Sequence, residues 1–182
     1  MNVDLRLVAA RVAGGDAAAF RPIVDHTRAP LYRLAARLVG NLADAEDVLQ
    51  DAYANAFRAL LAGQYDGRSK VETWLYRIVA NTCVDHLRKR REKHSDETRE
   101  PRFDGLVHAE ARIALRELDK LLDSLQPLDR AALVLVAVEG LSAKDAAEAL
   151  GATEGAVEQR LVRARAALRM KTEQPEVKHG RA

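Results

Sequence analysis

The stretch SAKDAAEALGATEGAVEQRLVRAR, residues 142–165, decides the fold of the second half of the chain. Ser142 and Asp145 form an S-x-x-D signal for a helix start, because the hydroxyl can accept a backbone N–H and the acid suits the positive helix end. Gly151 predicts the end of this helix, since glycine adopts the left-handed conformation without strain. Thr153 can cap a second helix. The inward face of that helix consists of Val157, Leu161, Ala164 and Leu168.

The second helix of this stretch is basic on its other faces. Its arginines there are Arg160, Arg163, Arg165 and Arg169. A short helix, a glycine turn and a longer basic helix describe a helix-turn-helix, which places its second helix in the major groove of DNA. An ordinary pair of antiparallel helices with a solvated charged face is the alternative that the spacing alone leaves open.

The composition favours an all-α fold. Hydrophobic residues make up 48% of the 182 residues but aromatic residues only 4%, so the cores are built from Ala, Leu and Val. The net charge is +2, yet the charges are sorted by segment: acids gather in residues 44–51, and bases in residues 88–93 and 160–171. Sorted charge suggests two partners of opposite sign, a basic one and a nucleic acid.

Several function classes lack the residues that they need. Cys83 is the only cysteine, which excludes an intramolecular disulfide and suggests a reducing compartment. Cys83 and His86 have metal-compatible spacing, but without further ligands we expect a half-buried cysteine and an exposed histidine. We predict no catalytic residue, no metal, no cofactor and no enzyme activity. The start of the sequence lacks a signal peptide, and the longest apolar run, residues 131–138, cannot span a bilayer, so we expect a cytoplasmic protein without membrane insertion.

The first half of the sequence predicts a bundle of helices. A helix over residues 4–13 is followed by one that Asp16 can cap and that Pro30 breaks or kinks, and a third run covers residues 31–39. The next helix, residues 44–60, has an apolar stripe and an opposite face of acids, Gln50 and Asn55. The helix dipole explains part of this acidity, and a docking face for a basic partner is the alternative of equal weight.

A polar loop at residues 64–70 precedes a helix over residues 71–91 that carries Trp74 near its start and ends in a basic run. Such a helix suits a position along DNA, with basic side chains on phosphates and polar ones at base edges. Aromatic side chains beside the loop could shelter unstacked bases, although packing in the core is the more common role of a residue like Trp74.

Periodicity disappears over residues 93–108, where charges of both signs surround Pro101 and Gly105. We predict a flexible linker there between two helical domains, residues 1–92 and 109–171, with a frayed tail at residues 172–182. In the second domain we expect a helix over residues 110–125 and another that starts at Pro127 and is apolar on most sides, hence central to the core.

Three motifs in this order resemble the extracytoplasmic-function (ECF) group of bacterial sigma factors, group IV of the sigma-70 family. The first, DAEDVLQD at residues 44–51, is similar to the helix of the family that binds polymerase. The second, TWLYRIVAN at residues 73–81 with DHLR at 85–88, resembles its minus-ten-reading helix. The third combines LQPLDR at residues 125–130, EGLS at 139–142 and the helix-turn-helix, and resembles its minus-thirty-five domain.

The resemblance implies a role for each domain. The first would be sigma region 2, which binds the clamp of core RNA polymerase and melts the minus-ten element, and the second would be sigma region 4, near the polymerase flap. The implied polymerase-binding residues are Asp44, Asp47, Val48, Gln50 and Asp51. The implied minus-ten residues are Tyr65, Arg68, Lys70, Trp74, Arg77, Asn81, Asp85, Arg88 and Arg91. The implied minus-thirty-five residues are Ser142, Thr153, Glu158, Gln159, Arg160, Arg163 and Arg165.

Two positions depart from the pattern of the family. Val71 stands where an aromatic residue is usual, and Glu158 replaces a basic residue. Phosphate repels an acid there, but the acid can accept a hydrogen bond from a cytosine amino group.

The resemblance further implies promoter DNA as a ligand, a linker inside the polymerase channels and control by an anti-sigma protein. A free-standing helix-turn-helix regulator of duplex operators remains an alternative, and it requires neither the acidic residues 44–51 nor the helix at 74–81. A helical adaptor without a DNA role is a third possibility, for which charge reversal at Arg160 and Arg163 would leave function intact.

Overall fold

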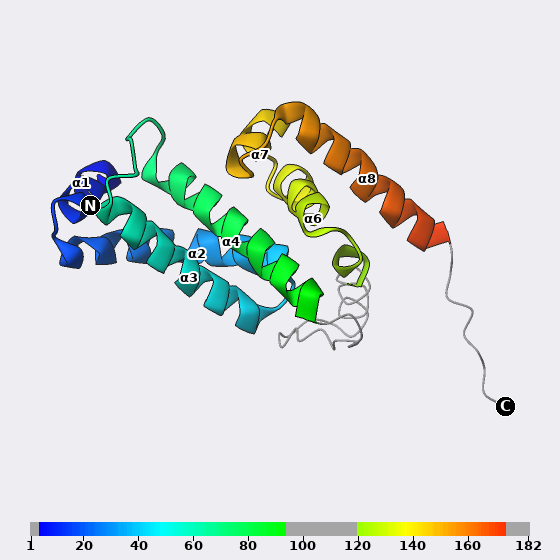
Figure 1. Ribbon diagram of the computed structural model, residues 1–182, viewed down its shortest axis with the longest axis horizontal. Helices are drawn as coiled ribbons and strands as arrows, with labels where there is room; N and C mark the ends of the chain where they lie inside the picture. Colours follow the sequence, from blue (N-terminus) through cyan, green and yellow to red (C-terminus); the bar gives the residue numbers. More distant parts are fainter. Residues whose placement is uncertain (1–3, 94–119, 174–182) are drawn as a thin grey trace.

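The computed structural model describes residues 4–93 and 120–173, and all regular structure in those residues is helical. The first part contains α1 (Leu5–Ala13), the short 3-10 turn η1 (Ala17–Ala19), α2 (Phe20–Val39), α3 (Leu42–Leu61) and α4 (Val71–Lys93). The second contains α6 (Pro127–Leu133), the π-helical turn η2 (Val134–Val138), α7 (Ala143–Ala149) and α8 (Glu154–Glu173). The all-α prediction is confirmed (Figure 1).

Short polar side chains set helix starts, as the sequence predicted at Ser142 and Thr153. Asp16 instead caps the 3-10 turn η1 by accepting from the Ala19 N–H, and α2 begins after Ala19 without a side-chain cap. Ser142 accepts a hydrogen bond from the Asp145 N–H at 3.1 Å. The Thr153 hydroxyl accepts from the Ala156 N–H at 3.3 Å and so begins α8. Each cap satisfies a backbone donor that has no partner within its helix.

The predicted division of the second helix at Pro30 is wrong, because α2 continues through it from Phe20 to Val39. A proline removes one backbone hydrogen bond, but the helix gains more from its buried stripe. That stripe consists of Ile23, Thr27, Leu31, Leu34, Ala35, Leu38 and Val39. The stripe spans both sides of Pro30, so packing against α3 and α4 holds the two halves in one helix.

The N-terminal domain is a bundle in which α2, α3 and α4 all contact one another and α1 packs across their end. Helix α3 buries one stripe of small and aliphatic residues: Ala45, Val48, Leu49, Ala52, Ala56 and Leu60. Phe20 packs edge-on against Tyr53 and Phe57, with centroid distances of 6.1 and 5.2 Å. The opposite face of α3 is thereby fixed toward solvent.

The C-terminal domain is built around α6, which contacts α8 and continues into η2. Pro127 is the first residue of α6, as predicted, and Ala131, Ala132, Val134 and Leu135 are buried. Gly151 closes the turn between α7 and α8 with a φ of 59°, a left-handed conformation that favours glycine. The predicted helix-turn-helix is thus present, and Val157, Leu161 and Ala164 form its buried face.

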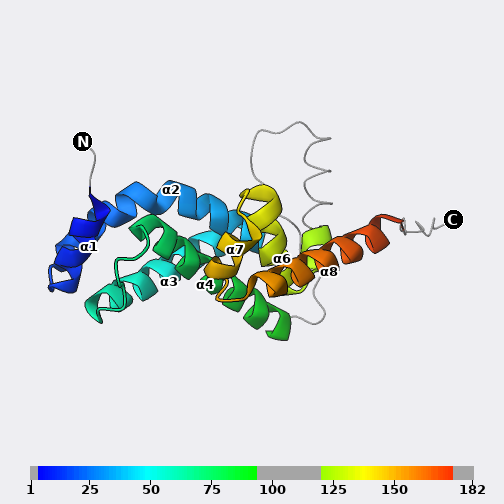
Figure 2. The same ribbon diagram turned by 90° about the horizontal axis from the view of Figure 1, so that it is seen from above.

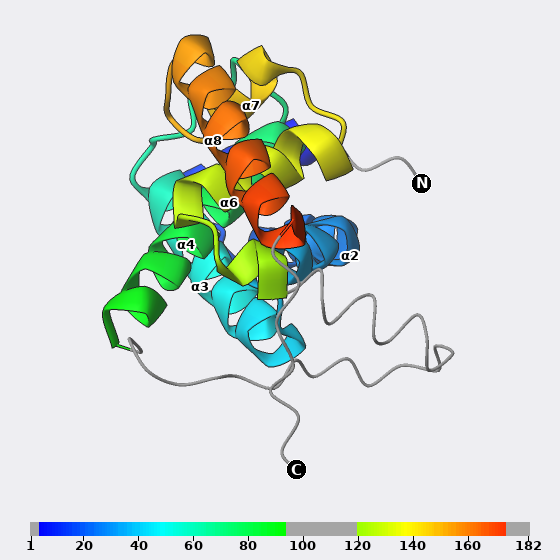
Figure 3. The same ribbon diagram turned by 90° about the vertical axis from the view of Figure 1, so that its right-hand side faces the viewer.

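The two domains pack on each other, which the sequence did not indicate. Helix α4 contacts α2 and α3 on one side and α6 and α7 on the other. Figures 1 and 3 show α4 between the two groups of helices, and the buried apolar residues of both domains form one continuous cluster. Seen from above in Figure 2, α1 lies at one end of the molecule and the end of α8 at the other. Apart from Lys93, the predicted linker lies outside the described residues.

Candidate polymerase and promoter interfaces

The acidic face of α3 divides into an exposed part and a part that faces α4. Asn41 caps the helix, with its side-chain oxygen 2.8 Å from the Ala43 N–H. Asp47, Gln50 and Asp51 are exposed and project from one side of α3. Val48, which the motif includes, is 1% exposed and packs in the core, so its side chain holds the helix in place rather than presenting itself to a partner.

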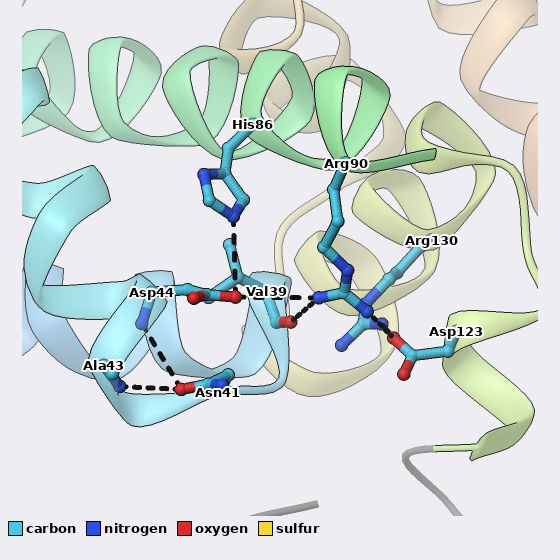
Figure 4. A network of polar contacts seen from close by, with 8 residues as sticks. All are labelled: Val39, Asn41, Ala43, Asp44, His86, Arg90, Asp123 and Arg130. Atoms are coloured by element: carbon cyan, nitrogen blue, oxygen red, sulfur yellow. Dashed lines mark hydrogen bonds and ion pairs between the residues drawn. The ribbon is translucent and has the colours of Figure 1, made fainter. Parts of the chain in front are cut away.

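Asp44 lies at the start of α3 but points toward α4. Its Oδ2 atom is 3.5 Å from His86 Nε2 and 3.7 Å from Arg90 Nη1 (Figure 4). Its side chain is 23% exposed, so these charges are only partly screened by water. Among the predicted polymerase-binding acids, Asp44 is therefore engaged within the chain, whereas Asp47 and Asp51 face solvent.

The loop before α4 carries an aromatic pair. The rings of Tyr65 and Trp74 have their centroids 5.1 Å apart, and the Tyr65 hydroxyl donates to the Ser69 carbonyl at 2.6 Å. Both rings are half-buried, so Trp74 is neither a full core residue nor a free platform. Arg68 and Lys70 are exposed on the same loop. Val71, in place of the usual aromatic residue, is fully buried.

The predicted minus-ten residues on α4 fall on two faces. Asn81, Asp85 and Arg88 are exposed to solvent. Arg77 and Arg91 instead turn toward the C-terminal domain: Arg77 Nη1 lies 3.6 Å from Glu148 Oε1, and Arg91 donates to the Leu125 carbonyl at 3.0 Å. The arginines of α4 are thus divided between a solvent-exposed stripe and an interdomain stripe.

Helix α8, the second helix of the helix-turn-helix, presents a mixed polar surface. Glu158, Gln159 and Arg165 are exposed, and Arg160 is half-buried. Arg163 is held by α6: its Nε and Nη2 atoms donate to the two oxygens of Asp129 at 3.2 and 2.9 Å. These hydrogen bonds raise the pKa of Arg163, so the guanidinium stays protonated. The predicted residues Ser142 and Thr153 act as helix caps: their side chains accept from the N–H groups of Asp145 and Ala156.

Sequence reasoning missed the polar residues that join the domains: Arg37, Arg90, Asp123, Arg130 and Glu139. Their only sequence signal was a charged residue within an otherwise apolar helix, as at Arg130, which is 1% exposed.

The expectation for Cys83 was also wrong, because Cys83 is fully buried and His86 is only half-exposed. Burial raises the pKa of the Cys83 thiol to about 12, with nearby Arg130 opposing the shift. Within the described ranges no cluster of His, Cys, Asp and Glu could hold a metal.

A hollow of about 390 Å³ lies between α4 and α7. Its apolar wall includes Leu141 and Ala149. Its polar rim includes the carboxylates of Glu72, Asp145 and Glu148 together with the Arg77 guanidinium, which pairs with Glu148. The hydroxyl of Tyr76, another wall residue, is buried, and burial together with the Glu139 carboxylate raises its pKa. The hollow is thus an acidic groove whose two sides belong to different domains.

Comparison with known families matches both halves of the chain. Residues 23–93 match sigma-70 region 2, and residues 115–168 match sigma-70 region 4. The ECF RNA polymerase sigma factor SigM of Mycobacterium tuberculosis is 38% identical over 167 residues, which cover 91% of this chain and 82% of SigM. The chain belongs to the ECF family of RNA polymerase sigma factors. The RNA polymerase sigma-H factor of Pseudomonas aeruginosa is also 38% identical, over 87% of this chain and 88% of that protein.

Solved structures share the fold of this chain. The structure of CnrH in complex with the cytosolic domain of CnrY is similar with a TM-score of 0.62 and 30% identity, over 92% of this chain and 96% of that one. A sigma factor RpoE from Bartonella quintana, solved with the anti-sigma factor NepR, has a TM-score of 0.59 at 24% identity, over 85% and 96% of the two chains, and supports the fold alone. This ECF sigma factor is therefore a transcription-initiation protein, and none of its described helices is long and apolar enough to cross a membrane.

Proposed function

We propose that this ECF sigma factor binds the clamp of core RNA polymerase through the exposed acids of α3. The observation that carries the proposal is that Asp47, Gln50 and Asp51 project together from a helix whose other side is buried in the core. An acidic surface on a rigid helix attracts a basic partner and fixes its orientation. Asp44 joins this surface once its contacts with α4 are released, and Val48 supports it from within.

Promoter DNA is then addressed by two separate helices. The exposed stripe of α4, with Asn81 and Arg88, together with the loop that carries Arg68 and Lys70, suits the minus-ten element. The Tyr65–Trp74 pair beside that loop offers an aromatic surface for an unstacked base. Two DNA-binding elements of modest affinity give high promoter selectivity when both are tethered to one polymerase.

On α8, Glu158 and Gln159 are the exposed side chains best placed for base edges of the minus-thirty-five element. An acid at this position accepts from cytosine and is repelled by phosphate, so it favours a sequence with a cytosine opposite it. Arg165 supplies a phosphate contact. Arg163, bound to Asp129, keeps α8 seated on α6 and offers its remaining donor to the DNA backbone.

Polymerase binding is tested by reversing one exposed charge. Asp47→Lys should weaken holoenzyme formation without changing the helical content, because Asp47 is exposed and has no role in the core. The matched control is Asp25→Lys on α2, also exposed and paired with Arg21 at 3.6 Å. The two variants are compared by gel filtration with core polymerase. Equal assembly of both would remove α3 from the interface.

The minus-thirty-five assignment is tested with Arg160→Ala. If Arg160 reads a base, transcription should fall mainly at promoters that depend on the upstream element, by about 1–3 kcal/mol of binding free energy. Arg165→Ala should instead weaken binding to every sequence alike and reduce the salt dependence. Transcription in vitro from promoters with an intact or scrambled minus-thirty-five element separates the two. A uniform loss with Arg160→Ala would make it a phosphate contact.

An anti-sigma protein is the regulatory partner that we propose. The Bartonella sigma factor was solved with an anti-sigma factor, and CnrH with the cytosolic domain of CnrY. The acidic groove between α4 and α7 offers this chain a place for an amphipathic helix with basic residues. On the basis of the family we also propose that the protein acts in the cytoplasm and has no catalytic role.

The alternative, a free-standing regulator of duplex operators, predicts tight sequence-specific binding by the isolated chain. A gel shift with and without core polymerase distinguishes this alternative from the sigma-factor function.

A further inference from the structure

Val162 is a large apolar residue on the solvent face of α8. It is 66% exposed, whereas Val157 and Leu161 on the opposite side of the helix are buried. A β-branched residue has a slightly lower helix propensity than alanine, so an exposed valine does not strengthen α8. The fold thus gives no reason for a valine at this position, and its side chain is available for a contact outside the chain.

Val162 belongs to the same exposed stripe of α8 as Glu158 and Gln159. Residues three and four apart are neighbours on a helix surface, so Val162 lies one turn beyond these two polar residues. Gly155 lies one turn before them, and a Cβ added to it would point into open space. Because no side chain projects from Gly155, a partner can come close enough to this stripe for the short side chain of Val162 to touch it.

Two arginines of α8 are directed away from this stripe. Arg163 gives two of its donors to Asp129 on α6. Arg160, three residues after Val157 and four before Ala164, lies beside the buried face, and one of its guanidinium nitrogens is shielded from solvent. Arginine is the side chain that most often reads guanine in the major groove. On α8 the stripe instead presents an acid, an amide and an apolar group.

These three side chains match the major-groove edges of three bases. A carboxylate accepts from the amino group of cytosine, an amide pairs with adenine, and an apolar side chain contacts the methyl group of thymine. A protein partner is a poorer match for Val162. Exposed charges surround it at Glu158, Arg165 and Arg169, and charged residues are depleted at the centre of protein interfaces.

We propose that Val162 is a specificity-determining residue that reads a thymine of the minus-thirty-five element, beside the cytosine read by Glu158. The inference rests on the proposed function of α8. Four residues of a helix span about 6 Å, and base pairs are stacked about 3.4 Å apart. With α8 along the major groove, the thymine and the cytosine therefore belong to base pairs about two steps apart.

Selection from a promoter library identifies the preferred bases. Holoenzyme made from the full chain and core polymerase is mixed with duplex promoter fragments randomised in the minus-thirty-five region, and the bound fragments are sequenced. The parent should enrich a thymine and a cytosine about two base pairs apart. Val162→Ala should lose the thymine preference and keep the cytosine preference, and Glu158→Gln should do the reverse. Val162→Ala keeps the helix, because the position is exposed and alanine is the best helix former.

Removal of the methyl group from the DNA tests the contact itself. The selected thymine is replaced by deoxyuridine, which lacks only the C5-methyl group. The parent holoenzyme should bind this promoter about three- to fivefold more weakly, as expected for the loss of one buried methyl group. Val162→Ala should bind both promoters alike. The matched control is Met170→Ala, which removes another apolar side chain of α8 that is 66% exposed and should leave the discrimination intact.

Equal binding of the thymine and deoxyuridine promoters by the parent would overturn the role of Val162, as would an unchanged thymine preference in Val162→Ala. Weaker assembly of Val162→Ala with core polymerase in the absence of DNA would assign the side chain to a protein contact instead. A parent library without enrichment at any minus-thirty-five position would refute the proposed function of α8, and the reading of thymine with it.

Discussion

At the scale of single residues, Cys83 illustrates how burial alone sets chemical behaviour. The thiol is fully buried on α4, and its pKa rises from 9.0 to about 12 because the thiolate would lose its hydration there. The sequence identified it as the only cysteine but could not tell full from partial burial. One apolar stripe of α4 contacts α2 and α3, and the sequence contained no sign that a second domain covers the opposite stripe.

Alkaline pH should therefore destabilise the protein through Cys83. Between pH 9 and 12 the unfolded chain can lose the thiol proton while the folded one keeps it, so the stability contributed by this group is present below pH 9 and lost as pH rises toward 12. The difference in unfolding free energy between the parent and Cys83→Ala should shift by about 1 kcal/mol between pH 8 and 10, to the disadvantage of the parent. Urea unfolding at both pH values measures it. Parallel pH profiles would contradict a buried thiol.

At the scale of elements, the sequence predicted the helix caps and the helix-turn-helix because both depend on residues close together in the chain. Ser142, Thr153 and Gly151 act locally, and each lies where it was expected. Pro30 was misjudged because its local cost is outweighed by tertiary packing along α2. Arg163 was read as a DNA contact, and its pairing with Asp129, 34 positions away, had no local signal.

The pair formed by Asp129 and Arg163 should control how α8 is held. Asp129→Asn removes one charge-assisted acceptor from a carboxylate that is 7% exposed, so it should lower the unfolding free energy by about 1–3 kcal/mol and weaken binding to the minus-thirty-five element. Glu154→Gln, an exposed acid at the start of α8, is the matched control and should change stability little. Thermal unfolding and promoter binding are measured together. A stable Asp129→Asn chain would mean that apolar packing alone seats the helix.

At the scale of the whole molecule, the decisive feature is that α4 serves two domains. Sequence periodicity predicted two helical domains correctly but carried no information on their packing, since the contacts join residues far apart in the chain. Arg37 and Glu139, for example, are 102 positions apart. The continuous buried cluster implies that the domains stabilise each other across α4.

This shared core should make the free chain unfold in urea as one unit. Trp74, the only tryptophan, reports on the N-terminal domain by fluorescence, and circular dichroism reports on both, so the two curves should coincide. Leu87→Ala should separate them, because Leu87 is buried on α4 and lines a hollow with Leu122, Leu125 and Pro127 of the C-terminal domain. The matched variant Leu60→Ala removes a buried leucine of α3 and should cost about 2–5 kcal/mol while the two curves stay together. Two transitions in the parent chain would show that the interface adds too little to join the domains, and closure would then depend on a bound partner.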